Sequence, residues 1–181
     1  MVAAGGRIRV ILTGGAPLSP ESHRFIRNCM GCPLLQGYGL TETAACATIM
    51  QLEEGTVGRV GPPVQGINIR LENWEEGNYR VTDSPRPRGE ILIGGGQLAQ
   101  LASKYVSGGG NVAAGYYRNP EKTEEEFYTD AAGRRWFRSG DIGRVEEDGT
   151  LSIIDRKKDL VKLQYGEYVS LGKVGEEDSF T

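Results

Sequence analysis

The residues from Gln36 to Thr43 hold side chains that together suit a polyphosphate and its metal ion. Their sequence is Gln-Gly-Tyr-Gly-Leu-Thr-Glu-Thr, and the apolar run that follows, Ala44 to Met50, is expected to form a helix. At the start of a helix, the Thr41 hydroxyl and the backbone N–H groups can bind phosphate oxygens. The Glu42 carboxylate can bind Mg²⁺, a hard cation that prefers oxygen ligands.

The tyrosine and glycines of this stretch suit a nucleotide. Tyr38 offers a flat ring for stacking on a base, and Gly37 and Gly39 allow the backbone to approach a ligand closely. The alternative is an ordinary helix start, with Thr41 as N-cap and Glu42 complementing the helix dipole. Short motifs often match by chance, so the choice depends on the rest of the chain.

A second group of polar residues occurs much later. Asp141 follows a Ser-Gly turn, and Arg156 follows a short apolar run. An ionised carboxylate can accept hydrogen bonds from two neighbouring sugar hydroxyls, and a guanidinium can contact ribose or phosphate. The alternatives are a turn aspartate and a solvated charge cluster.

The composition indicates a folded protein without a strong electrostatic partner. The 181 residues are 38% hydrophobic and 25% charged, enough for one domain or for a domain and a piece of another. The net charge of −3 gives no electrostatic reason to expect nucleic acid or an anionic membrane as partner. No apolar run approaches the roughly 18–20 residues that span a bilayer, and no signal-peptide pattern is present. We therefore expect a cytoplasmic chain without a membrane anchor.

The cysteines and the single histidine are not expected to do chemistry. Cys29, Cys32 and Cys46 are odd in number and too few, with His23, to form a zinc site at useful spacing. We expect reduced, structural thiols. His23 is expected at the surface of a helix.

The first 50 residues have a strand–helix–strand–helix pattern typical of a parallel sheet. Strands are expected over Arg7–Leu12 and Pro33–Gly37, with a helix over Pro20–Cys29 that has Ser19 as N-cap. Ligands bind at the carboxyl ends of such strands. The turn from Gly14 to Pro17 and the stretch with Tyr38 should therefore lie side by side.

Residues 51–155 are expected to form a β-rich subdomain. Asp148-Gly149 predicts a hairpin, and the two glycine triplets that bracket residues 94–110 mark an atypical insertion. The expected strands are Ile67–Glu72, Glu90–Ile93, Gly143–Glu146 and Leu151–Ile154, and the expected helix is Glu121–Phe127.

Seven blocks occur in a fixed order, and together they resemble the adenylate-forming, or AMP-binding, superfamily. The blocks are Gly14–Ser19, Tyr38–Thr43, Gly58–Pro63, Arg88–Ile91, Gly115-Tyr116, Ser139–Gly143 and Asp155–Lys162. Within that superfamily, the stretches Trp136–Gly143 and Ile153–Leu171 are similar to a long-chain fatty-acid–CoA ligase. The resemblance implies an α/β plus β-rich fold, the C-terminal part of the large domain. Residues 156–181 would be the hinge and the start of a small C-terminal domain.

The resemblance implies a two-step reaction with ATP and CoA as substrates and Mg²⁺ as metal. A fatty carboxylate attacks the α-phosphate of ATP to give acyl-AMP and pyrophosphate, and the CoA thiol then displaces AMP to give the thioester. The implied nucleotide-binding residues are Gly15, Ala16, Pro17, Tyr38, Gly39, Thr41, Asp141 and Arg156.

The same resemblance implies a role for each residue. The loop Gly15–Pro17 would line one face of adenine and Tyr38 the other, and Asp141 would bind the ribose hydroxyls. Thr41 would hold phosphate, Glu42 the Mg²⁺, and Arg156 the same nucleotide. Lys158 matches the hinge of the small domain, and Lys162 lies in the segment presented to the site for thioester formation.

Family members are several times longer and have a phosphate loop, a fatty-acyl tunnel and a C-terminal lysine outside the matched blocks. We therefore expect a fragment or splice product that makes no acyl-CoA alone. A non-catalytic nucleotide-binding remnant or interaction module is the alternative. A member acting on aryl or amino acids is disfavoured by the run from Asp155 to Gln164. Full-length relatives often associate with the endoplasmic reticulum, the mitochondrial outer membrane or the peroxisome.

Overall fold

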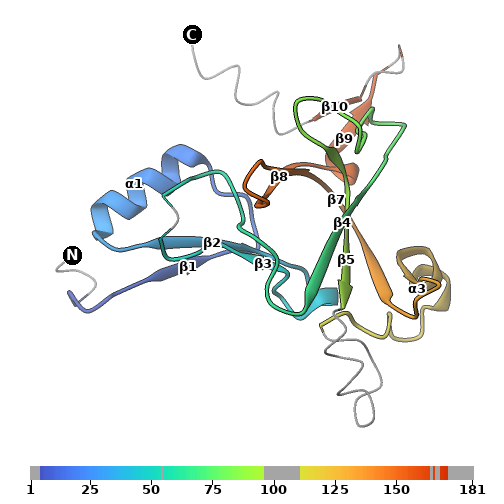
Figure 1. The fold of residues 1–181 in the computed structure, drawn as a ribbon, viewed down its shortest axis with the longest axis horizontal. Helices are drawn as coiled ribbons and strands as arrows, with labels where there is room; N and C mark the ends of the chain where they lie inside the picture. Colours follow the sequence, from blue (N-terminus) through green and yellow to red (C-terminus); the bar gives the residue numbers. More distant parts are fainter. Residues whose placement is uncertain (1–4, 54, 96–110, 164, 166–167, 171–181) are drawn as a thin grey trace.

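The computed structural model describes residues 5–53, 55–95, 111–163, 165 and 168–170. Figure 1 shows a small α/β unit at the N-terminal end beside a larger, strongly twisted sheet. The mixed α/β, sheet-rich fold agrees with the sequence prediction. Most of the predicted insertion, residues 96–110, lies outside the described residues.

The N-terminal unit contains the predicted parallel strand pair and its connecting helix. Strands β1 (Ile11–Thr13) and β2 (Leu34–Tyr38) are parallel, with Ile11 opposite Leu34. Helix α1 (Pro20–Met30) begins as predicted, because the Ser19 hydroxyl accepts from the backbone N–H of Ser22 at 3.1 Å. Gly31 ends it in the left-handed conformation, with φ of 61°.

Strand β1 is shorter than predicted and begins at Ile11 rather than Arg7. Strand β2 offers partners only to Ile11, Leu12 and Thr13. Ile8 and Val10, which are β-branched and suggested a longer strand, remain 42% and 41% exposed. Their residue types favour a strand, but among the described residues no strand pairs with them.

The predicted helix over Ala44–Met50 is wrong. Residues Thr41–Thr43 form one turn of 3₁₀ helix, η2, and Ala44 and Ala45 then have φ of 51° and 69°. Strand β3 (Thr48–Ile49) follows and pairs antiparallel with β2. Left-handed residues interrupt a helix, so the second half of this run extends back along the sheet.

Thr41 is also not an N-cap, because Leu40 occupies that position and makes no side-chain capping bond. The short turn is closed instead by Thr43, whose hydroxyl accepts from Leu40 N at 3.0 Å and contacts Leu40 O at 3.1 Å. The alternative reading of this stretch, in which Thr41 caps a helix, is therefore excluded. Thr41 instead lines the pocket described below.

His23 is fully buried, which contradicts the prediction of a surface residue. Its Nε2 lies 2.8 Å from the carbonyl oxygen of Leu34, so the ring links α1 to β2. The three cysteines are free thiols, and Cys32 is buried. None of these four residues is part of the pocket lining described below.

The larger sheet contains five strands in the order β4-β5-β7-β6, with β8 paired to the other half of the same β7 edge. The strands are β4 (Ile67–Glu72), β5 (Arg88–Gly95), β6 (Phe127–Thr129), β7 (Arg135–Val145) and β8 (Leu151–Arg156). The prediction was right for β4 and close for β8. The predicted strand over Gly143–Glu146 omits most of β7, which begins at Arg135.

Short elements complete the chain. Helix α3 (Pro120–Glu126) leads into β6, and η3 (Lys157–Asp159) follows β8. Strands β9 (Leu160–Lys162) and β10 (Tyr168–Ser170) form a hairpin at one end of the larger sheet (Figure 1). Within the described ranges, no helix is long and apolar enough to cross a membrane.

The hydrophobic core joins the two sheets. Val60 N donates to Leu151 O at 2.8 Å, and Leu151 N donates to Gly61 O at 3.1 Å. Ala47, Val60, Ile91, Ile93 and Leu151 are buried together, and Tyr38 packs against this cluster. The end of β2 is thereby held against β7 and β8.

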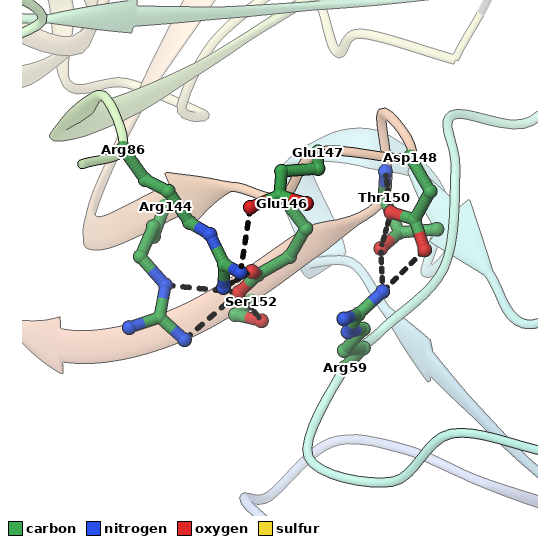
Figure 2. Close-up of polar contacts among 8 residues, drawn as sticks. All are labelled: Arg59, Arg86, Arg144, Glu146, Glu147, Asp148, Thr150 and Ser152. Carbon is green, nitrogen blue, oxygen red and sulfur yellow. Dashed lines mark hydrogen bonds and ion pairs between the residues drawn. The ribbon is translucent and has the colours of Figure 1, made fainter.

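The β7–β8 hairpin turns at Asp148-Gly149 as predicted, with Gly149 at φ of 81°. Figure 2 shows a buried carboxylate beside this turn, Glu146, surrounded by Arg86, Arg144 and Ser152. Arg144 Nε and Ser152 Oγ donate to Glu146 Oε1 at 2.9 and 2.7 Å, and Arg86 pairs with Oε2. This ion-pair network fixes the half of β7 that follows the site.

Candidate nucleotide-binding site

A pocket of about 630 Å³ lies at the carboxyl ends of β1 and β2. Five of the predicted site residues line it: Gly15, Gly39, Thr41, Glu42 and Arg156. The rest of the lining is Leu12, Thr13, Gly14, Gly37, Leu40, Ala45 and Ile49. The predicted residues Ala16, Pro17, Tyr38, Asp141, Lys158 and Lys162 are not part of this lining. The two strand-end loops therefore share one rim, as predicted.

Glycines allow these loops to come together. A Cβ on Gly39 would lie 2.4 Å from the carbonyl oxygen of Ala45, closer than any side chain tolerates. A Cβ on Gly14 would lie 3.1 Å from the carbonyl oxygen of Gly37. Glycine at these two positions therefore allows the backbone segments to approach each other closely.

Asp141 lies directly behind Arg156 and is only 1% exposed. Arg156 Nε donates to its Oδ1 at 2.5 Å, and the Tyr38 hydroxyl donates to its Oδ2 at 2.8 Å. Burial and the charge of Asp141 raise the pKa of Tyr38 well above its ordinary value, so its hydroxyl keeps the proton that it donates. The hydrogen bond to Asp141 likewise raises the pKa of Arg156. Tyr38 lies 103 positions and Arg156 lies 15 positions from Asp141 in the sequence, yet both bind its carboxylate.

A bulge in β7 aims Asp141 at this point. The pairing with β5 shifts between Glu90 and Leu92, and Gly140 has φ of 71°. Ser139 Oγ donates to Ile91 O at 2.7 Å and accepts from Asp141 N at 3.1 Å. Bulges commonly redirect a side chain toward a site, and the Ser-Gly pair is the sequence signal for this one.

The Glu42 carboxylate is held by a segment that the sequence did not link to it. Tyr116 OH donates to Glu42 Oε1 at 2.8 Å and also contacts Glu126. The backbone N–H of Ala113 donates to Glu42 O at 2.8 Å. Burial and the two carboxylates raise the pKa of Tyr116.

The pocket residues suit a Mg²⁺ that arrives with phosphates. Among the described residues, no cluster of three His, Cys, Asp or Glu side chains could enclose a metal ion. Within the same ranges, Oε2 of Glu42 has no hydrogen-bond partner, and Glu42 faces the pocket next to Thr41. Mg²⁺ is commonly held by one or two carboxylates together with substrate phosphates and water, so this donor set fits.

The two predicted lysines lie beyond the pocket. Lys158 is exposed within η3, two residues after Arg156. Lys162 is exposed at the end of β9, with its Nζ 5.7 Å from the ring centroid of Tyr168. Neither is part of the pocket lining.

Comparison with known protein families gives a match to the AMP-binding enzyme model over residues 3–105. The chain belongs to the AMP-binding enzyme family. Residues 3–105 include both strand-end loops and Glu42, so the match covers most of the pocket.

Individual proteins match over nearly the whole chain. The chain is 56% identical to long chain acyl-CoA synthetase 8 of Arabidopsis thaliana, covering 94% of this chain and 22% of the relative. The ATP-bound crystal structure of MatB from Rhodopseudomonas palustris superposes with a TM-score of 0.71 at 30% identity, covering 99% of this chain and 31% of that one. O-succinylbenzoate coenzyme A synthetase from Bacillus subtilis, in complex with ATP and magnesium, superposes with a TM-score of 0.69 at 26% identity. The superposition covers 96% of this chain and 31% of that one. The chain thus spans about a fifth of the length of the curated relative it matches.

Three further residues lie around this site that the sequence did not predict. Asn111 Nδ2 donates to the carbonyls of Thr43 and Cys46 at 2.9 and 3.0 Å, and Tyr116 and Glu126 surround Glu42. Tyr116 belongs to a motif block, but no role followed from the residues. Asn111 has no local signal, because its partners Thr43 and Cys46 lie 68 and 65 positions away, and Glu126 approaches Glu42 only through Tyr116.

Proposed function

We propose that this chain supplies the nucleotide-binding side of the active site of a long-chain fatty-acid–CoA ligase. That enzyme activates a fatty acid with ATP to acyl-AMP and then transfers the acyl group to CoA. The observation that carries the proposal is the convergence of Tyr38, Asp141 and Arg156 beside a pocket lined by Thr41 and Glu42.

The charges around the pocket suit a nucleotide. The Asp141 carboxylate has about four lone-pair sites, of which Tyr38 and Arg156 use two. The remaining sites can accept the two ribose hydroxyls when Arg156 shifts toward the phosphates. Adenine would lie between the Gly15–Pro17 loop and Tyr38.

The negative charge of the nucleotide's phosphates would lie beside Thr41, Glu42 and Arg156. Thr41 can donate its hydroxyl to a phosphate oxygen, and Glu42 would hold Mg²⁺, which neutralises charge on the phosphates when bound. Among the described residues that line the pocket, Arg156 is the only one with a cationic side chain. Lys158 would act as a hinge, and Lys162 would reach the site only after a movement about it.

This lining favours nucleotide binding over turnover by the 181-residue chain alone. Charge that develops on the α-phosphate needs several positioned donors, and the loss of one such donor typically lowers a rate by about 10²–10³-fold. We therefore expect AMP and ATP binding without measurable acyl-CoA formation. The fatty acid and CoA would bind to parts of the enzyme outside this pocket.

The test is calorimetric titration of the 181-residue chain with AMP, and with ATP in the presence and absence of Mg²⁺. We expect saturable binding of both nucleotides, with Mg²⁺ strengthening only ATP binding. A chain that is folded by circular dichroism but binds neither nucleotide would disprove the proposal.

The substitution Glu42→Gln should weaken the binding of the metal without weakening the binding of the nucleotide. The amide keeps the shape and the hydrogen bond to Tyr116 but loses the charge that attracts Mg²⁺. We expect Mg·ATP affinity to fall at least about tenfold, as it does when even an outer partner of a metal ligand is removed. Binding of AMP without metal should stay within about twofold. If the affinities for Mg·ATP and for AMP fell equally, Glu42 would not be a metal ligand.

A further inference from the structure

The surroundings of Glu42 contain one hydroxyl between two carboxylates. Tyr116 OH lies 2.8 Å from Glu42 Oε1 and also contacts Glu126 Oε2. A hydroxyl has one proton and donates to one acceptor at a time. Two carboxylates on one donor repel each other, so the arrangement is favourable only if something offsets that charge.

Packing does not require this arrangement. The Tyr116 ring already packs edge-on against Phe127, with centroids 5.6 Å apart, in a cluster with Val112 and Phe137. Phenylalanine would fill the same space. The packing of the core therefore does not need the hydroxyl or its two carboxylate contacts.

Tyr116 is held firmly in place from both sides. Its backbone N–H donates to the Thr123 hydroxyl at 2.9 Å. Gly115, with φ of 144°, leaves no room for a side chain, because a Cβ would lie 2.4 Å from Thr123 Cγ2. The same segment binds the backbone of Glu42 through Ala113. Tyr116 therefore cannot move away from Glu42 without disturbing the start of α3.

The positive charge nearby only partly offsets the pair. Lys122 Nζ lies 3.5 Å from Glu126 Oε1 and 5.2 Å from the Tyr116 ring centroid. It is about half exposed, so its effect is screened by water. Glu42 lines the pocket, and its Oε2 has no hydrogen-bond partner in the described part of the chain. A divalent cation at that oxygen would relieve the repulsion.

We propose that Tyr116 is a positioning residue that orients the Glu42 carboxylate for a divalent cation, and that Glu126 holds the Tyr116 hydroxyl and adds negative charge to that position. Outer partners of this kind fix a ligating carboxylate and typically contribute 10–100-fold to metal affinity. This inference rests on the proposed function, because it refines how the nucleotide's metal is held.

The test titrates Mg²⁺ into the 181-residue chain at fixed ATP and follows bound nucleotide, with AMP binding in EDTA measured in parallel. Tyr116→Phe should raise the Mg²⁺ concentration for half-maximal effect by about 10–100-fold. Glu126→Gln should shift it in the same direction by less. Both variants should bind AMP in EDTA within about twofold of wild type.

Tyr117→Phe is the matched control, since Tyr117 is 85% exposed and adjacent in sequence. It should leave the Mg²⁺ titration unchanged. Thermal unfolding of each variant checks that the fold is intact.

Each result decides between the two proposals. A Tyr116→Phe titration that overlays wild type would overturn the positioning role while nucleotide binding stands. Equal losses of AMP and Mg·ATP binding in Tyr116→Phe would show a purely structural role and also overturn it. A wild-type chain that binds AMP but shows no Mg²⁺ effect on ATP would overturn the metal role alone. A wild-type chain that binds no nucleotide would overturn the proposed function and this inference together.

Discussion

Replacing Asp141 with alanine is expected to weaken AMP binding by about 100-fold or more. Two hydrogen bonds from ribose hydroxyls to a carboxylate would be lost, and hydrogen bonds to charged groups contribute about 1.5–3 kcal/mol each. A loss of about 3 kcal/mol corresponds to roughly 100-fold in affinity. Arg156 would also lose the partner that holds it at the pocket. Calorimetric titration with AMP, in EDTA, measures the change.

Two further variants make this prediction sharp. Asp141→Asn keeps the volume but removes the charge, and should retain the fold with intermediate affinity. Asp159→Asn alters an exposed carboxylate in η3 that is not part of the pocket lining, and should stay within about twofold of wild type. Unchanged AMP affinity in a folded Asp141→Ala chain would remove Asp141 from the nucleotide site.

Replacing Glu146 with alanine is expected to lower the free energy of unfolding by about 3–5 kcal/mol. Its side chain is 1% exposed and accepts from Arg144 and Ser152 while pairing with Arg86 (Figure 2). Removing Glu146 takes the buried carboxylate away from both Arg144 and Arg86, and leaves Arg86 with the exposed Glu147 as its carboxylate contact. Since domains are stable by only about 5–15 kcal/mol, much of the stability of the chain would be lost. Urea unfolding measures the difference.

Glu147 provides the matched control, because it is the next residue and also contacts Arg86, at 3.3 Å, but its side chain is 85% exposed. Surface substitutions usually change stability by less than about 0.5 kcal/mol, so Glu147→Ala should be nearly neutral. Similar losses for both variants would show that the buried network around Glu146 does not stabilise the sheet.

The same network predicts a pH dependence. Burial alone would raise the pKa of Glu146, but its bonds to Ser152, Arg144 and Arg86 outweigh it and hold the pKa below the ordinary value. A carboxyl whose pKa is lower in the folded state contributes stability above its unfolded pKa, about 4, and loses it as pH falls further. Wild-type stability should therefore fall more steeply below about pH 4 than that of Glu146→Gln. Parallel curves for the two chains would contradict this.

Local signals were enough to predict several elements. Ser19 and Pro20 at one end and Gly31 at the other mark the limits of α1, because caps are determined by neighbouring residues. The β-branched run of β4 and the Asp148-Gly149 turn are equally local. The shared rim of the two strand-end loops followed from the parallel pairing of β1 and β2.

The errors came from contacts distant in sequence. The apolar run after Thr43 is compatible with a helix, but Asn111 binds the Thr43 and Cys46 carbonyls and the run turns back along β2. His23 is buried because its acceptor, the Leu34 carbonyl, lies on the following strand. Glu126 meets Glu42 only through the Tyr116 hydroxyl. No pattern within a short window encodes such pairs.

The most direct measurement of the central claim is a crystal structure of the chain with AMP. The expected result has both ribose hydroxyls within hydrogen-bond distance of Asp141, adenine between the Gly15–Pro17 loop and Tyr38, and the phosphate near Thr41 and Arg156. AMP bound at another surface, or bound in this pocket with its ribose turned away from Asp141, would contradict the assignment of the site.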